Sequence, residues 1–263
     1  MKLRKSLVLI LPFACFLLIL TPNVQGNSAK LAYIYYDDTT TANSYYNFLY
    51  NEGFAIDVID VDVIASGMFN SHDIIIIGPD LGSWGTLYMD DTKEGIVDDS
   101  GAAIIGLGNG GWAFFGISGL NLYIGYDNGG STTGITNIDV IDDDHKIFNS
   151  PNDLPTGNIQ LYLTGSTVYY TVAPPSHVEL FGNVAGSSTY YCLCSEHERY
   201  FLWGFESSPG AMTTSGKNLF LNILNYLGPR ESEGILGYNI LLILGTISVL
   251  SLMIIWKKFN KKI

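Results

Sequence analysis

The sequence predicts an α/β domain built on a doubly wound, mostly parallel sheet with an antiparallel extension. In the first half of the chain, short apolar segments alternate with helix-like segments at intervals of about 25 residues, which is the pattern of parallel strands joined by helices. The run 74–77 consists of four isoleucines, as expected for a strand that is covered on both faces. In the second half, Gly and Pro separate short apolar segments that no longer alternate with helices.

The first half supplies the predicted parallel strands and the helices between them. Tyr45, Phe48 and Leu49 recur at helical spacing, and Gly53 stops that helix. The expected strands cover 31–36, 55–61, 74–77 and 101–105, and the expected helices cover 41–51 and 87–98. Loops at the carboxyl ends of such strands form the usual ligand crevice, which places it at 37–40, 78–84 and 106–112.

The second half supplies the predicted antiparallel strands and a closing helix. Strands are expected over 138–141, 159–163, 168–172 and 178–181, and a hairpin is expected to join 190–194 to 200–205. The closing helix covers 216–227 and ends at Gly228 and Pro229.

Both ends of the chain are apolar and basic. Residues 1–26 have the layout of a signal peptide, with an uncleaved signal anchor as the alternative. Residues 235–256 carry no charge and are long enough to span a bilayer as a helix, and lysines follow directly. We therefore expect a single-pass type I protein of the cell membrane, with an extracellular domain (27–229), a joint (230–234), a transmembrane helix (235–256) and a cytoplasmic tail (257–263).

The charge distribution restricts the partners. All 25 acidic residues lie in 27–234, with only six of the 13 basic residues, so this segment has a net charge of −19. Such a segment repels a phosphate backbone, which argues against nucleic acid as a partner. The expected partners are the membrane, through the C-terminal span, and an unidentified extracellular ligand or protein. We expect no cofactor and no bound metal.

Weaker patterns concern the cysteines and the acidic clusters. Cys192 and Cys194, spaced to face the same side of a strand, are interpreted as buried free thiols or as partners in an intermolecular bridge. A metal cluster with His197 is the weaker alternative, since zinc sites usually use wider cysteine pairs. The acidic clusters, 57–62 and 142–145, are interpreted as solvated faces.

The most specific local pattern is a glycine-rich turn between a strand and a short aromatic helix, Gly106-Leu-Gly108-Asn-Gly110-Gly-Trp112. Turns of this kind hold one residue at their apex in a strained conformation, with free backbone N–H groups nearby. Asn109 and Trp112 are candidates to line a ligand pocket there. A purely structural role, turning the chain tightly against the helix, is the alternative.

At this turn the chain resembles the class I glutamine amidotransferase-like superfamily, which includes DJ-1-like and trehalose-utilisation-type domains. The resemblance implies a flavodoxin-like fold over most of 30–228. Members carry G-x-C-x-G at the turn, so Gly108 stands at the position of the nucleophile. The loop Gly78-Pro-Asp-Leu-Gly82 is similar to one that helps to hold an oxyanion. A late F-H-P-E motif is matched by Phe205-Glu206-Ser-Ser208, which puts Glu206 at the histidine position and Ser208 at the glutamate position.

The missing nucleophile predicts a catalytically degenerate domain with no catalytic residue among these three positions, because glycine has no side-chain atom that can attack an acyl group. The leading hypothesis is a membrane-anchored cell-surface protein that binds or scaffolds. The alternative is an extracellular, glycan-directed hydrolase that uses strand-end carboxylates, with Glu206 paired with Asp37 or Asp38. The ligand-binding candidates are Asp37, Asp38, Gly78, Asp80, Asn109, Trp112 and Glu206.

Overall fold

The computed structural model describes residues 29–117 and 120–228. The predicted signal peptide, joint, transmembrane helix and cytoplasmic tail lie outside the described residues. Within the described part of the chain, no helix combines the length and the apolar character that a membrane crossing requires.

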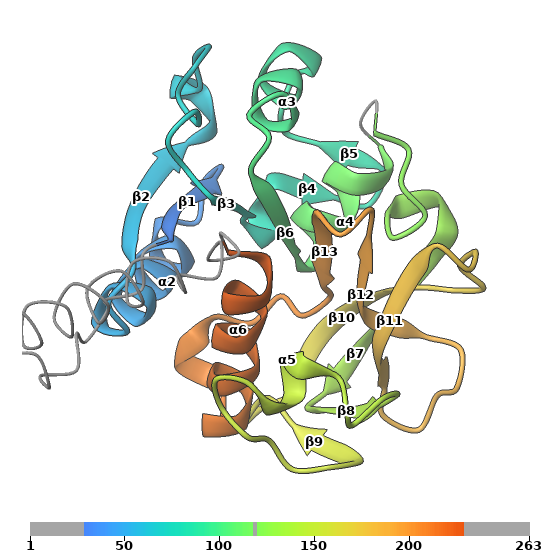
Figure 1. The fold of residues 1–263 in the computed structure, drawn as a ribbon. Coiled ribbons are helices and arrows are strands. Elements are labelled where there is room, and N and C mark those ends of the chain that lie inside the picture. Colours follow the sequence, from blue (N-terminus) through green and yellow to red (C-terminus); the bar gives the residue numbers. More distant parts are fainter. Residues whose placement is uncertain (1–28, 118–119, 229–263) are drawn as a thin grey trace, which may run out of the picture.

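Five parallel strands form one half of the central sheet (Figure 1). Their spatial order is β2-β1-β3-β6-β13, and each pairs with its neighbour in parallel. Numbered by their own succession along the chain, they run 2-1-3-4-5, which is the flavodoxin-like order with its switch point between β1 and β3. The predicted fold class is confirmed for this half. The five strands are β1 (Lys30–Tyr35), β2 (Ala55–Asp60), β3 (Ile74–Ile77), β6 (Ala103–Leu107) and β13 (Tyr200–Trp203).

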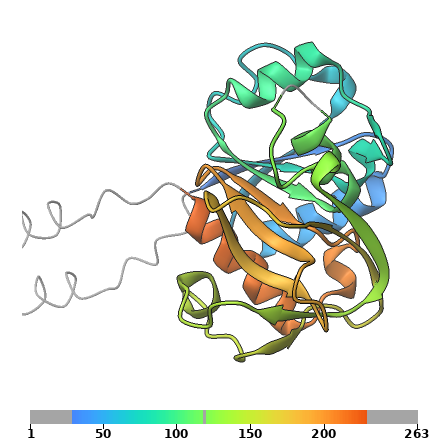
Figure 2. The same cartoon turned by 90° about the vertical axis from the view of Figure 1, so that its right-hand side faces the viewer.

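The sheet continues beyond β13 as the predicted antiparallel extension (Figure 2). The hairpin between β12 and β13 is confirmed, and β11, β8 and β9 follow in that order. Strand β10 pairs with β12 and with β7, while β4 and β5 form a separate ribbon. These strands are β4 (Gly82–Ser83), β5 (Thr86–Leu87), β7 (Gly129–Ile135), β8 (Asn137–Val140), β9 (Asn158–Gln160), β10 (Ser166–Thr171), β11 (Val178–Val184) and β12 (Tyr191–Glu196).

Helices cover both faces of the sheet, and the sheet separates two apolar clusters. Alternate residues of β1 enter different clusters: Leu31 and Tyr33 pack with α2 (Thr39–Asn51) and α6 (Thr214–Leu227), whereas Ala32 and Ile34 pack with α3 (Asp91–Asp98) and α4 (Gly108–Gly116). A short helix, α5 (Lys146–Asn149), packs beside α6.

Capping residues explain where the helices differ from the expected ranges. Helix α2 begins at Thr39 because the Asp38 carboxylate accepts the Thr41 N–H, with an O···N distance of 2.9 Å. Helix α3 begins only at Asp91, because Asp90 caps it and residue 87 belongs to β5. The Gly- and Thr-rich strand β7 was not predicted, since its residues carry little apolar periodicity.

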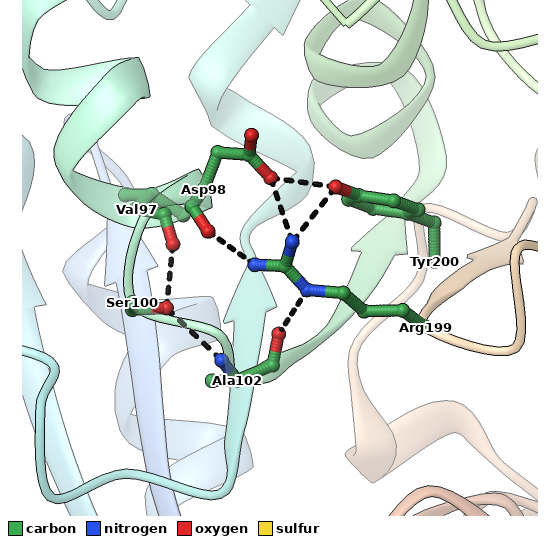
Figure 3. A network of polar contacts seen from close by, with 6 residues as sticks. All are labelled: Val97, Asp98, Ser100, Ala102, Arg199 and Tyr200. Atoms are coloured by element: carbon green, nitrogen blue, oxygen red, sulfur yellow. Dashed lines mark hydrogen bonds and ion pairs between the residues drawn. The ribbon is translucent and has the colours of Figure 1, made fainter.

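A guanidinium network fixes the start of β13 to the end of α3 (Figure 3). Arg199 donates to the Asp98 carboxylate at 3.0 Å and to the carbonyl oxygens of Ala102 and Asp98. The Tyr200 hydroxyl donates to the same carboxylate at 2.6 Å. Burial, with the hydrogen bond to Asp98, raises the pKa of Tyr200 to about 12. The hairpin that carries His197 is therefore held at its base by a planar, multiply bonded cation.

Candidate functional site

The turn between β6 and α4 has no room for a side chain at its apex. Gly108 is the first residue of α4 and has a φ of +48°, in the left-handed region. A Cβ atom at this position would lie 2.5 Å from Cγ of Glu206 and 3.0 Å from its Cα. A nucleophilic side chain is therefore absent from residue 108, and none fits there unless Glu206 moves.

The other glycines of the turn allow close approach of backbone segments. A Cβ atom at Gly110 would lie 2.0 Å from the Gly78 carbonyl oxygen, and one at Gly111 would lie 2.1 Å from Cα of Gly106. Gly110 and Gly111 thus have a structural role, because they let α4 pack directly on β6 and on the loop after β3.

Glu206 directs its carboxylate at the start of α4. Burial raises the pKa of this carboxyl group above its ordinary value, and hydrogen bonds from Thr167, Tyr169 and the Asn109 backbone N–H oppose the rise. The Asn109 N–H is one of the amides that a helix N-terminus leaves without an intrahelical partner. Glu206 therefore supplies the first turn of α4 with a negatively charged partner from within the chain.

Strand β10 completes this site, a feature that the sequence did not indicate. The Glu206 N–H donates to the Thr167 carbonyl at 3.1 Å, and the Tyr169 N–H donates to the Gly204 carbonyl at 2.8 Å. These backbone contacts carry the Thr167 and Tyr169 side chains over the end of β13. The only sequence signal was Tyr169 in a tyrosine pair on a predicted strand.

The loop after β1 is closed by Asp80. One carboxylate oxygen of Asp80 accepts the backbone N–H groups of Tyr36, Asp37 and Asp38 at 2.9, 2.8 and 2.7 Å. The loops after β1 and β3 meet at the switch point, which is the usual ligand position of this fold. Here that position holds a carboxylate of the chain itself.

The predicted site residues are only partly brought together. Asp80 joins the loop of Asp37 and Asp38, whereas Glu206 joins Gly108 and Asn109. Asp38 serves as the N-cap of α2, so one of its carboxylate oxygens is engaged by the helix. Ser208 precedes a short 3-10 helix, Pro209–Ala211, with no capping hydrogen bond from its side chain.

An aromatic cluster adjoins the Glu206 site. The Trp112 ring packs against Trp84, Tyr126 and Tyr169, with centroid distances of 5.4, 4.8 and 5.3 Å. Trp112 itself is buried, whereas Trp84 is 60% exposed.

Trp112 Nε1, Asn109 Oδ1 and the Tyr33 hydroxyl are buried without a hydrogen-bond partner. Unsatisfied buried groups of this kind are uncommon, and a bound molecule can satisfy them.

Comparison with known proteins establishes the fold. No protein-family model and no curated protein matches the chain. A chain of PurLQS from Thermotoga maritima aligns with a TM-score of 0.53 and 16% identity, over 76% of this chain and 99% of that one. SMU.1228c aligns with a TM-score of 0.50 and 12% identity, over 75% and 99%. A GMP synthase component from Thermoplasma acidophilum gives 0.49 and 14%, over 76% and 94%.

These structural neighbours confirm the resemblance to class I glutamine amidotransferase-like proteins at the level of the fold. The expectation of a membrane-anchored cell-surface protein is corrected. The neighbours with TM-scores of at least 0.50 are described as PurLQS and SMU.1228c, and neither is described as a cell-surface protein. The alternative of an extracellular, glycan-directed hydrolase was part of the same expectation and is corrected on the same finding.

Proposed function

We propose that the site around Glu206 binds a small organic cation, such as a primary amine or an amidinium group, with the Glu206 carboxylate as its counter-ion. The observation that carries this proposal is the half-buried Glu206 carboxyl group. Among the ion pairs of the described residues, none joins Glu206 to a Lys, Arg or His. The hydrogen bonds to Glu206 and the N-terminus of α4 offset the burial of its charge only in part, because its pKa is still raised, and a cationic ligand would stabilise the carboxylate further.

The surroundings of Glu206 support the same class of ligand. The Asn109 Oδ1 atom is a buried acceptor without a donor, which an N–H group of the ligand can supply. The neighbouring aromatic cluster offers ring faces, to which cations are attracted. The segment 27–234, with a net charge of −19, raises the local concentration of cations.

The same geometry argues against glutamine hydrolysis at this turn. Acyl transfer needs a nucleophile beside a base, and residue 108 has no side chain. Glu206 accepts from the backbone N–H that follows this position, so that donor is engaged by the chain itself.

Calorimetric titration of the full chain with a panel of alkylamines, guanidines, glutamine and matched carboxylic acids tests the proposal. We expect heat of binding from at least one cationic compound and none from the carboxylic acids. Glu206→Gln should weaken that binding about tenfold or more, the loss expected for a charge-assisted hydrogen bond. The exposed Glu52→Gln is the control and should bind unchanged. Absence of binding by all cations, or an equal loss in both variants, would refute the proposal.

A further inference from the structure

A second polar cluster lies at the turn between β12 and β13, at the opposite end of β13 from Glu206. It consists of His177, before β11, and of Glu196 and His197, at the turn between β12 and β13. One ligand atom from each of the three side chains lies within 4.8 Å of the others. The sequence did not indicate this cluster, because 19 residues separate His177 from Glu196.

The buried carboxylate is oriented by the backbone. Glu196 Oε2 accepts the N–H groups of Tyr123 and Ile124 at 2.8 and 3.3 Å, which leaves Oε1 to face the two imidazole rings. The Glu196 side chain is only 3% exposed, so its charge requires a positive partner. His177 Nε2 lies 3.2 Å and His197 Nε2 3.7 Å from Oε1.

The distances of the two histidine nitrogens from Glu196 Oε1 are close to those between ligands of a zinc ion. With metal–ligand distances of about 2.0–2.1 Å, two ligands of a tetrahedral ion lie about 3.3 Å apart. The observed 3.2 and 3.7 Å bracket that value. Two histidines and one carboxylate are also a common donor set of catalytic zinc sites.

The two imidazole rings of the cluster lie face to face. The rings of His177 and His197 stack with their centroids 5.6 Å apart and an interplanar angle of 12°. A divalent ion bound to both rings would place a positive charge beside the buried Glu196 carboxylate, which requires one.

The cluster keeps one side open. His177 and His197 are 47% and 61% exposed, and they line a cavity of about 420 Å³ together with Glu179, Ser195, Glu198 and Tyr226. A three-ligand site with an open fourth position is the arrangement of zinc ions that hold a water molecule or a substrate, whereas structural zinc sites are closed by four protein ligands.

The hairpin holds His197 in place. His197 and Glu198 both have positive φ values, +57° and +55°, and lie in the three-residue turn 197–199 between the paired residues Glu196 and Tyr200. Arg199, the next residue, is tied to Asp98 and Ala102 (Figure 3). The backbone on both sides of His197 is thus fixed relative to the sheet.

We propose that His177 Nε2, His197 Nε2 and Glu196 Oε1 bind one divalent zinc-like metal ion, whose open position faces the cavity. This proposal is independent of the cation site at Glu206.

Titration of the metal-free full chain with Co²⁺, followed by visible absorption, and equilibrium dialysis against Zn²⁺ test it. We expect one ion per chain and the visible bands of four- or five-coordinate cobalt. His177→Gln and His197→Gln should each lower the affinity by roughly tenfold or more, since even outer-shell changes cost 10- to 100-fold. His145→Gln is the matched control, because His145 also pairs with a glutamate, Glu179, at 3.3 Å.

Three results would overturn the metal site. The first is that neither ion binds below about 1 mM. The second is that the double variant His177→Gln/His197→Gln binds the ion with unchanged affinity. The third is that His145→Gln loses as much affinity as the two cluster variants. Glu196→Gln should also lose the ion. Because Glu196 is buried and its variant can misfold, the two exposed histidine variants decide the question.

Discussion

The Cβ position of Gly108 lies 2.5 Å from Cγ of Glu206, so a side chain at residue 108 would clash with the glutamate side chain at residue 206. A side chain at residue 108 requires a smaller residue at 206 or a displaced strand end. The apex of the turn and the end of β13 are therefore one packing unit, although 98 residues separate them in the sequence.

Gly108→Ala should lower the free energy of unfolding by about 2–4 kcal/mol, from the steric conflict with Glu206 added to the left-handed φ. Urea unfolding of the parent protein and of the variant measures this difference in the free energy of unfolding. Gly53→Ala is the control for backbone strain alone, since Gly53 has a φ of +89° and no atom within 4 Å of its Cβ position. In Gly108→Ala/Glu206→Ala the loss should be smaller than the sum of the two single losses. Additive losses would show that the two sites do not interact.

Glu206 should make the protein less stable as the pH rises. Its pKa in the folded state is raised, mainly by burial, above the ordinary value of 4.5. Between these two pKa values the folded state binds more protons than the unfolded state, so the free energy of unfolding falls with increasing pH. Glu206→Gln removes this dependence, and its stability relative to the parent protein should increase from about pH 4.5 upwards. Urea unfolding across a pH series measures the difference, and a constant difference would contradict the assignment.

Asp80→Ala should destabilise the protein by about 1–2 kcal/mol, because three backbone N–H groups of the loop after β1 lose their common acceptor. Hydrogen exchange should quicken at Tyr36, Asp37 and Asp38. The exposed Asp153→Ala serves as the control and should change neither quantity. Unaltered exchange at the three amides would exclude Asp80 as the residue that orders this loop.

Arg199→Ala should cost about 2 kcal/mol of stability through the loss of charge-assisted hydrogen bonds to Asp98. Arg199→Lys should recover only part of this, since lysine cannot reproduce the fork-shaped contacts. Lys93→Ala removes an exposed pair with Asp62 at 3.5 Å and should cost less than about 1 kcal/mol. Thermal unfolding distinguishes the three, and equal losses in Arg199→Ala and Lys93→Ala would contradict a special role for Arg199.

Cys192 and Cys194 should resist thiol reagents in the folded protein. Both are buried free thiols, and burial raises the pKa of each well above the usual range, so little thiolate forms. In a Cys15→Ser background, a thiol-specific dye should label neither thiol under native conditions and both in denaturant. Labelling under native conditions at the rate of a free cysteine would contradict this.

The parallel half of the fold followed from local sequence, because the strands 30–35, 55–60, 74–77 and 103–107 are short apolar runs separated by turn residues. The antiparallel half of the fold was harder to predict from the sequence. Strand β7 pairs through glycines and threonines, and the β11–β12 ladder changes register near Gly182. This irregularity places Cys192 and Cys194 in different apolar clusters, contrary to the expectation that both face the same side.

The candidate site was predictable only where its residues follow a strand. The loop around Asp80 lies at the end of a parallel strand, so the parallel-sheet pattern indicated it. Glu206 was indicated by the resemblance of Phe205-Glu206-Ser-Ser208 to the F-H-P-E motif. Thr167, Tyr169 and His177 reach their sites through antiparallel pairings over long sequence distances, and no local pattern encodes such pairings. Steric exclusion between Gly108 and Glu206 is likewise a three-dimensional property.

The contact of the Asp80 carboxylate with the loop after β1 has a consequence for competition with dissolved anions. An acceptor attached to the same chain has an effective concentration in the millimolar range or above. Free phosphates or carboxylates at ordinary metabolite levels would have to displace it from three amides at once. The loop after β1 is therefore expected to bind dissolved anions poorly, because a carboxylate of the same chain already occupies its three amide groups.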